Sequence, residues 1–148
     1  MVAAYEKDVV AWANEQAALL RARRFSALDI EHLAEEIEDV GKSEQRELAS
    51  RMAVLLTHLL KWQYQPVFRG ASWEATIQTQ RRRIDIWLHK TPSLKPMLED
   101  PEWIEDMWAD ARDNAARETG IEFVRFPETC PWSMAQALEG NFYPDQPS

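Results

Sequence analysis

Apolar residues recur every three or four positions between residues 28 and 66, which is the spacing of one face of an α-helix. The phase of this stripe carries across Gly41, so we favour one long helix there, although a break at Gly41 stays open. Asp29 is a suitable N-cap, and Pro66 ends the pattern. The stripe consists of Ile30, Leu33, Ala34, Ile37, Leu48, Met52, Leu55, Leu59 and Trp62.

Three further segments show helical periodicity, and a short helix is predicted near the C-terminus. Asp100-Pro101 is typical of a helix start, Gly120 of a helix end, and Ser133 with Gln136 of a capping box. Strand signals are absent apart from residues 121–125. The sequence therefore predicts an all-α fold: a bundle of about four main helices with a long central helix and a C-terminal strap plus short helix, in one domain over residues 1–148. The other helices are expected at about residues 4–24, 72–90, 101–119 and 133–139, with Ser72 as the third N-cap.

Five polar residues fall on the predicted buried faces or their edges, and they come from all four main helices. They are Gln16, Arg51, His58, Gln80 and Glu118. If the apolar stripes meet, these side chains gather in the core, with Glu118 in salt-bridge distance of Arg51. They then form either a small polar pocket, in which His58 titrates, or a satisfied hydrogen-bond network that fixes the helix register. We favour the network.

A metal site is a weaker hypothesis. Asp29, His32 and Glu36 share one helix flank, and carboxylate-x-x-His spacing occurs in di-iron bundles. Those bundles use two such helices, and the only second contribution here is Asp85 with His89, which project opposite the apolar face. We therefore assign no metal ligand and expect no cofactor. Phosphate-binding glycine loops and the common hydrolase and zinc motifs are also absent, so the catalytic residues are unknown.

Charge and cysteine content narrow the class of partner. The net charge of −8 disfavours nucleic-acid binding, and the arginines at 81–83 point 100° apart on a helix, so they form no single basic face. Cys130 is the one cysteine and has no activating neighbour in sequence, so we expect a packed or partly exposed thiol. No signal peptide and no apolar run of about 20 residues is present, so we expect a soluble, cytoplasmic protein without a membrane segment.

Short motifs spread over nearly the whole chain support these expectations. They are Tyr5, Asp8, Trp12, Gln16 and Leu19-Leu20-Arg21; Leu28-Asp29; Leu33-Ala34-Glu35-Glu36-Ile37-Glu38; Gly41; His58-Leu59-Leu60-Lys61-Trp62; Gln65-Pro66; Trp73; Gln80-Arg81; Glu118-Thr119-Gly120; Phe126-Pro127; and Cys130-Pro131. Together they resemble the bacterial family called "domain of unknown function 29". The resemblance implies a small bacterial all-helical protein without an established activity, so it supplies no catalytic residues. His32 departs from the expected pattern.

Two classes of function are compatible with the sequence, and whether the protein is an enzyme stays open. We expect a non-enzymatic interaction module that binds an unknown protein partner or associates with itself, and neither nucleic acid nor a membrane. An apolar patch on an outer face would support it. The alternative is a small ligand-binding protein or enzyme with a polar core pocket around His58, which a cavity of at least about 300 Å³ would support. A metal-binding helical bundle is the second alternative.

Overall fold

The computed structural model describes residues 4–145, and it divides the chain into two compact units, Met1–Ser43 and Glu44–Ser148. Within residues 4–145 every regular element is helical, which confirms the all-α class. The organisation as one domain over 1–148 stays a prediction. The α-helices are α1 (Val9–Arg21), α2 (Ile30–Tyr64), α3 (Ala71–Lys90), α4 (Pro101–Thr119) and α5 (Met134–Leu138), and the 3-10 turns are η1 (Phe25–Ala27), η2 (Pro66–Phe68), η3 (Pro92–Glu99) and η4 (Phe123–Arg125).

The first unit contains α1, η1 and the first turns of α2. Asp8 caps α1 by accepting a hydrogen bond from the backbone N–H of Ala11 at 3.1 Å, so this helix begins at Val9 and not near residue 4 as predicted. Among residues 4–43 only Trp12 and Gln16 are buried. Both lie on α1, and their polar atoms reach the N-terminal end of α2.

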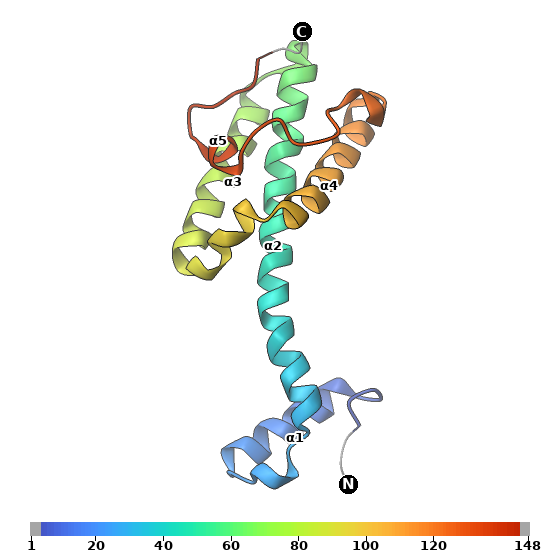
Figure 1. Cartoon of the computed structure of the whole chain (residues 1–148), viewed down its shortest axis with the longest axis vertical. Coiled ribbons are helices and arrows are strands. Elements are labelled where there is room, and N and C mark those ends of the chain that lie inside the picture. The colour runs from blue at the N-terminus through green and yellow to red at the C-terminus, as the bar shows by residue number, and fades with distance from the viewer. Residues whose placement is uncertain (1–3, 146–148) are drawn as a thin grey trace. The chain divides into compact units, whose positions relative to one another are not determined.

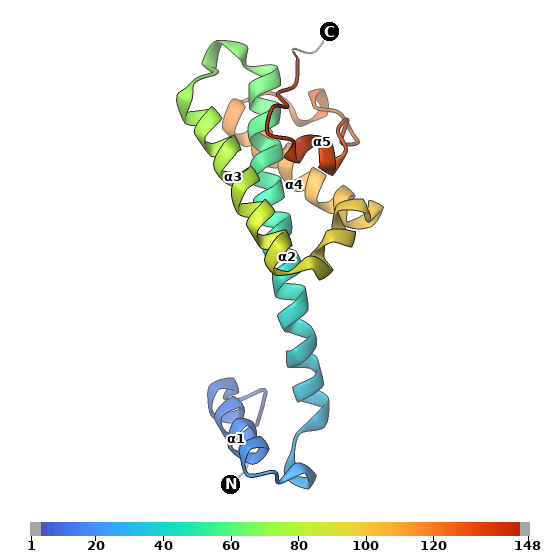
Figure 2. The same ribbon diagram turned by 90° about the vertical axis from the view of Figure 1, so that its left-hand side faces the viewer.

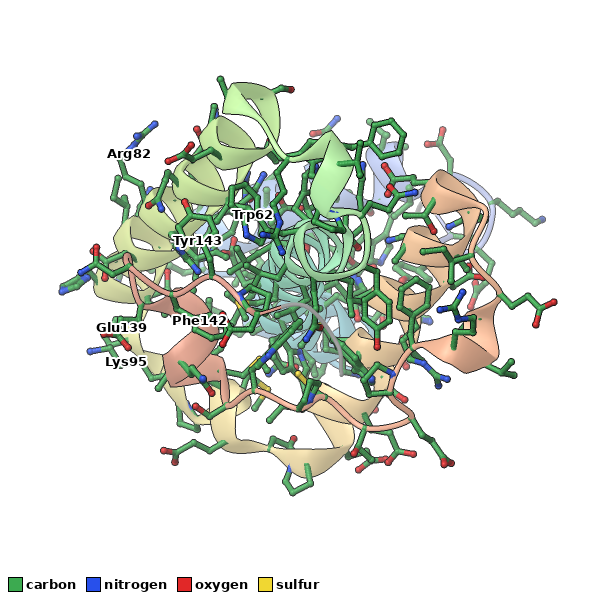
Figure 3. All side chains as sticks on the ribbon, turned by 90° about the horizontal axis from the view of Figure 1, so that it is seen from above. Trp62, Arg82, Lys95, Glu139, Phe142 and Tyr143 are labelled. Carbon is green, nitrogen blue, oxygen red and sulfur yellow. The ribbon has the colours of Figure 1, made fainter. Side chains whose placement is uncertain are left out.

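Helix α2 is continuous from Ile30 to Tyr64, so it does not break at Gly41, and it ends before Pro66 as predicted. Its second half carries the core of the second unit. Figures 1 and 3 show α3 and α4 on opposite sides of this half, where their apolar faces cover it. The fully buried side chains at the centre include Leu48, Met52, Leu55, Leu56, Leu59, Ile77, Ile84, Met107 and Trp108.

Several helix ends lie where the sequence predicts them, whereas the starts of α1 and α3 do not. Asp100 caps α4, Gly120 ends it in the left-handed region with φ of 76°, and Ser133 accepts a hydrogen bond from the N–H of Gln136 at 3.0 Å. Helix α3 begins two residues earlier than an N-cap at Ser72 predicts, because Gly70 is the N-cap. The strand signal at residues 121–125 is wrong, because a 3-10 turn forms there.

The C-terminal strap returns from the end of α4 across α2 toward α3, as Figures 1 and 2 show. It supplies Phe126, Trp132 and Met134 to the core. Its last described residues reach α2, where the rings of Tyr143 and Trp62 lie 4.7 Å apart between centroids, and Figure 3 shows these two side chains together. The strap therefore completes the hydrophobic core.

Candidate functional site

The first unit is held together by a network of aromatic and polar side chains between the N-terminal segment, α1 and α2. Trp12 donates its indole N–H to Asp29 Oδ2 at 2.9 Å, and Gln16 Oε1 accepts the backbone N–H of Asp29 at 2.8 Å. His32 Nδ1 lies 2.7 Å from Asp29 Oδ2, and the imidazole stacks on Tyr5 at 4.1 Å between ring centroids. Asp29 is therefore the centre of the network and the N-cap of α2.

Electrostatics within this network favour the charged form of the Asp29–His32 pair. The hydrogen bond between them raises the pKa of His32 above 6.5 and lowers that of Asp29 below 3.8. Tyr5 donates its hydroxyl to Glu36, and this bond raises the pKa of Tyr5 to about 12. A tyrosine with that pKa is a proton donor to Glu36 and not a base near neutral pH.

The proposed metal ligands Asp29, His32 and Glu36 do not meet at one point. Asp29 and His32 form a pair, whereas Glu36 binds Tyr5. Across residues 4–145, no group of three or more His, Cys, Asp or Glu side chains is arranged to hold a metal ion. The network orders the unit and offers no ligand set.

The first unit also has exposed apolar side chains. The stripe of α2 that is buried from Leu48 onward is open before that residue: Ile30 is 61 % exposed, Ile37 71 % and Val40 67 %. Ala34 is exposed between them. Further exposed apolar side chains of this unit are Val9, Val10, Leu20 and Phe25.

The predicted polar cluster does not form as expected. Gln16 belongs to the first unit, and Arg51, His58, Gln80 and Glu118 belong to the second. The predicted Arg51–Glu118 salt bridge is wrong: Arg51 pairs with Glu47 at 3.2 Å, and Glu118 pairs with Lys61 at 3.6 Å. Arg51 and His58 lie seven residues apart on the edge of the α2 stripe, so they flank the packed core and do not converge in it.

His58 is bound to its own helix, and one polar atom of Gln80 is unpaired. His58 donates its Nδ1–H to the carbonyl of Val54 at 2.9 Å, and burial lowers the pKa of its imidazole. Gln80 has a buried side-chain oxygen without a hydrogen-bond partner. The geometry therefore shows a neutral imidazole tied to its own helix.

Two cations of α2, Lys61 and Arg51, pack on aromatic rings of α3, and the sequence did not indicate this role for either of them. Lys61 Nζ lies 4.9 Å from the centre of the Trp73 ring, and the guanidinium of Arg51 lies 5.1 Å from that of Trp87. A cation on α2 and a tryptophan on α3 are far apart in sequence, so only the antiparallel pairing of the two helices reveals these contacts. The feature of the sequence that could have indicated these contacts is the spacing of Trp73 and Trp87, which places both rings on one flank of α3.

Cys130 is partly buried, as predicted, and donates its S–H to the carbonyl of Trp132 at 3.2 Å. Burial raises the pKa of the thiol to about 11, so the reactive thiolate is scarce at neutral pH. It also lines a cavity of about 490 Å³ with Trp108 and Trp132. This thiol is a packing group.

Comparison with known proteins identifies the family and gives no activity. A search of curated proteins and a search of solved structures returned no significant match. No helix within residues 4–145 is long and apolar enough to cross a membrane. The family model described as "Domain of unknown function DUF29" matches residues 4–143, which include both the network of the first unit and the strap of the second. The chain therefore belongs to the family of domain of unknown function DUF29.

Proposed function

We propose that this protein is a non-enzymatic interaction module whose first unit binds a basic amphipathic helix of a partner protein. The contact surface is the open apolar stripe, defined as Ile30, Ala34, Ile37 and Val40 on α2. The observation that carries the proposal is the exposure of its three large members, each more than 60 %. Contiguous exposed apolar side chains on an otherwise polar surface mark interaction sites.

Burial of this stripe provides enough free energy for association. Full burial of a Val or Ile side chain contributes about 1.5–3 kcal/mol, and 61 %, 71 % and 67 % of Ile30, Ile37 and Val40 is still exposed, so covering all three contributes roughly 3–6 kcal/mol. The loss of translational and rotational freedom opposes this term. The partner helix buries its own apolar face as well and adds charge pairs, and with these contributions we expect binding in the micromolar range.

Charge decides the chemistry of the partner. Residues 29–39 contain six acidic side chains and no Lys or Arg. Asp29 and Glu36 are engaged within the unit, while Glu31 and Glu38 are exposed on one flank of the stripe and Glu35 and Asp39 are exposed further round the same helix. A second copy would bring acidic groups against acidic groups, whereas a helix with lysines or arginines beside its apolar face would form ion pairs. We therefore commit to a basic amphipathic helix.

The alternative of an enzyme or ligand site around His58 receives less support. Its imidazole is held by the carbonyl of Val54, and burial lowers its pKa. The acidic charge of the chain is also consistent with the absence of nucleic acid among its partners. We place the protein in the cytoplasm, in keeping with a single, unpaired cysteine.

A binding experiment tests the proposal on the full chain. The probe is a 14-residue peptide of leucine and lysine with leucines at helical i, i+3, i+4 and i+7 positions, followed by fluorescence anisotropy. We expect micromolar binding that weakens with salt, and about a hundredfold loss for the Ile37→Ser/Val40→Ser double variant. The matched control is Val67→Ser/Phe68→Ser, which replaces two equally exposed apolar residues in η2 and should bind like the wild type.

Three results would contradict the proposal. Binding of the double variant as tight as that of the wild type would show that the stripe is not the contact surface. Equal binding of a leucine–glutamate peptide would remove the charge argument. A dimer at micromolar concentration that the double variant abolishes would assign the stripe to a second copy instead.

A further inference from the structure

A half-open cavity of about 420 Å³ lies between α2 and the end of α3, and every residue that lines it belongs to the second unit. Its volume falls in the range of small-molecule sites. The open apolar stripe contributes no residue to this cavity. The lining residues are Glu44, Arg51, Arg83, Ile86, Trp87, Lys90 and Thr91.

The cavity is basic in an acidic protein. Three of its lining side chains, Arg51, Arg83 and Lys90, are cations, and Glu44 is the only carboxylate among them. The chain as a whole carries a charge of −8. A local excess of cations in a concave, partly desolvated site attracts anions and strengthens the hydrogen bonds that they accept.

Two contacts hold the Arg51 side chain at the wall of this cavity. One of its terminal nitrogens pairs with Glu47 at 3.2 Å, and its guanidinium lies over the ring of Trp87. Its Nε is buried and has no hydrogen-bond partner. Glu47 and Trp87 therefore fix the Arg51 side chain in the wall of the cavity, where it contributes positive charge.

The walls also favour a flat apolar body beside the anionic group. Trp87 and Ile86 line the same cavity as the three cations, and Ile86 is exposed. An indole ring that already carries a guanidinium on one side offers a surface for stacking. We propose that this cavity binds a small planar organic anion, with a carboxylate or phosphate on Arg51, Arg83 and Lys90 and an aromatic body against Trp87 and Ile86.

The test uses phenyl phosphate and benzoate, with benzyl alcohol and inorganic phosphate as controls. Binding is followed on the full chain through the indole ¹H–¹⁵N resonance of Trp87, assigned with Trp87→Phe. We expect phenyl phosphate or benzoate to shift this resonance in a saturable manner and to bind more tightly than either control. The stronger of the two anions identifies the preferred head group.

A matched pair of arginines makes the test specific. Arg83→Gln should weaken binding about tenfold, because it removes one charge-assisted hydrogen bond. Arg82→Gln removes the same charge from the neighbouring position, where Figure 3 shows the side chain projecting away from the helices, and should leave binding unchanged. Both arginines are exposed, so both variants should fold.

The inference would be overturned by three outcomes. They are a Trp87 resonance that neither anion shifts, binding of benzyl alcohol as tight as that of benzoate, and an equal loss of affinity in the two arginine variants. None of these results depends on the open apolar stripe, because the Leu–Lys peptide is absent from the experiment.

Discussion

Arg81 is the residue whose replacement should destabilise the second unit most specifically. It is only 4 % exposed, and its guanidinium donates to three backbone carbonyls of the C-terminal segment. The distances are 2.9 Å to Ala137, 3.2 Å to Gly140 and 2.5 Å to Phe142. Its charge also lies 5.3 Å from the centre of the Tyr143 ring, and burial lowers its pKa. One side chain therefore fastens the strap to α3.

The expected loss follows from these contacts. Arg81→Met keeps much of the apolar volume but removes every donor, so the carbonyl of fully buried Ala137 stays without a partner at a cost of about 1–3 kcal/mol. The bonds to Gly140 and Phe142 contribute about 1 kcal/mol each, because water can replace part of them. We expect the free energy of unfolding to fall by about 3–5 kcal/mol.

Urea unfolding followed by tryptophan fluorescence measures this loss, with Arg82→Met as the matched control. Arg82 is exposed one position further along α3, so its replacement should change the free energy of unfolding by less than about 0.5 kcal/mol. Arg81→Lys should recover only part of the loss, because an ammonium cannot span three carbonyls as the guanidinium does. A loss below about 1 kcal/mol for Arg81→Met would refute the anchoring argument.

Three further predictions concern single residues. Asp29→Asn should lower the pKa of His32 toward 6.5 in an NMR titration. In the wild type, the contribution of His32 to the free energy of unfolding is complete below pH 6.5 and is lost as pH rises through the pKa of folded His32. The contribution of Asp29 is complete above pH 3.8 and is lost as pH falls through the pKa of folded Asp29. Gly41→Ala should stabilise α2 by about 0.5–1 kcal/mol in thermal unfolding, because the added Cβ meets nothing within 4 Å, and destabilisation would contradict an open position there. Cys130, with a pKa of about 11, should react slowly with a thiol reagent at pH 8 and rapidly in urea, and fast labelling of the native protein would show an exposed thiol.

Helix positions could be predicted from the sequence because they depend on local chemistry. Each helix end is set by residues within one turn of it: Pro66 follows the last residue of α2, Asp100-Pro101 begins α4, and Gly120 with its positive φ ends α4. The start of α1 was placed too early because Tyr5 continues the apolar phase of that helix. Asp8 nevertheless caps the helix and leaves Tyr5 free to reach α2.

The polar cluster could not be predicted, because periodicity gives a direction around one helix and no partner across the bundle. Glu118 was expected at Arg51, but Lys61 is the cation on α2 that it meets. The sequence shows Arg81 only as one of three consecutive arginines that point in different directions, and the return of the strap makes it a buried anchor. Such contacts join residues more than 50 positions apart, so they depend on how the helices pair.

The first unit illustrates how polar contacts and an apolar surface divide their roles. Only Trp12 and Gln16 are buried among residues 4–43, so hydrophobic burial contributes little to its stability. Two hydrogen bonds, from the Trp12 indole N–H to Asp29 and from the Asp29 N–H to Gln16, each contribute about 0.5–1.5 kcal/mol and fix how α1 meets α2. Because these bonds use polar groups, the stripe at Ile37 and Val40 stays available. If the proposed partner helix binds the stripe, it adds apolar burial to this unit, so binding and the stability of the unit are coupled.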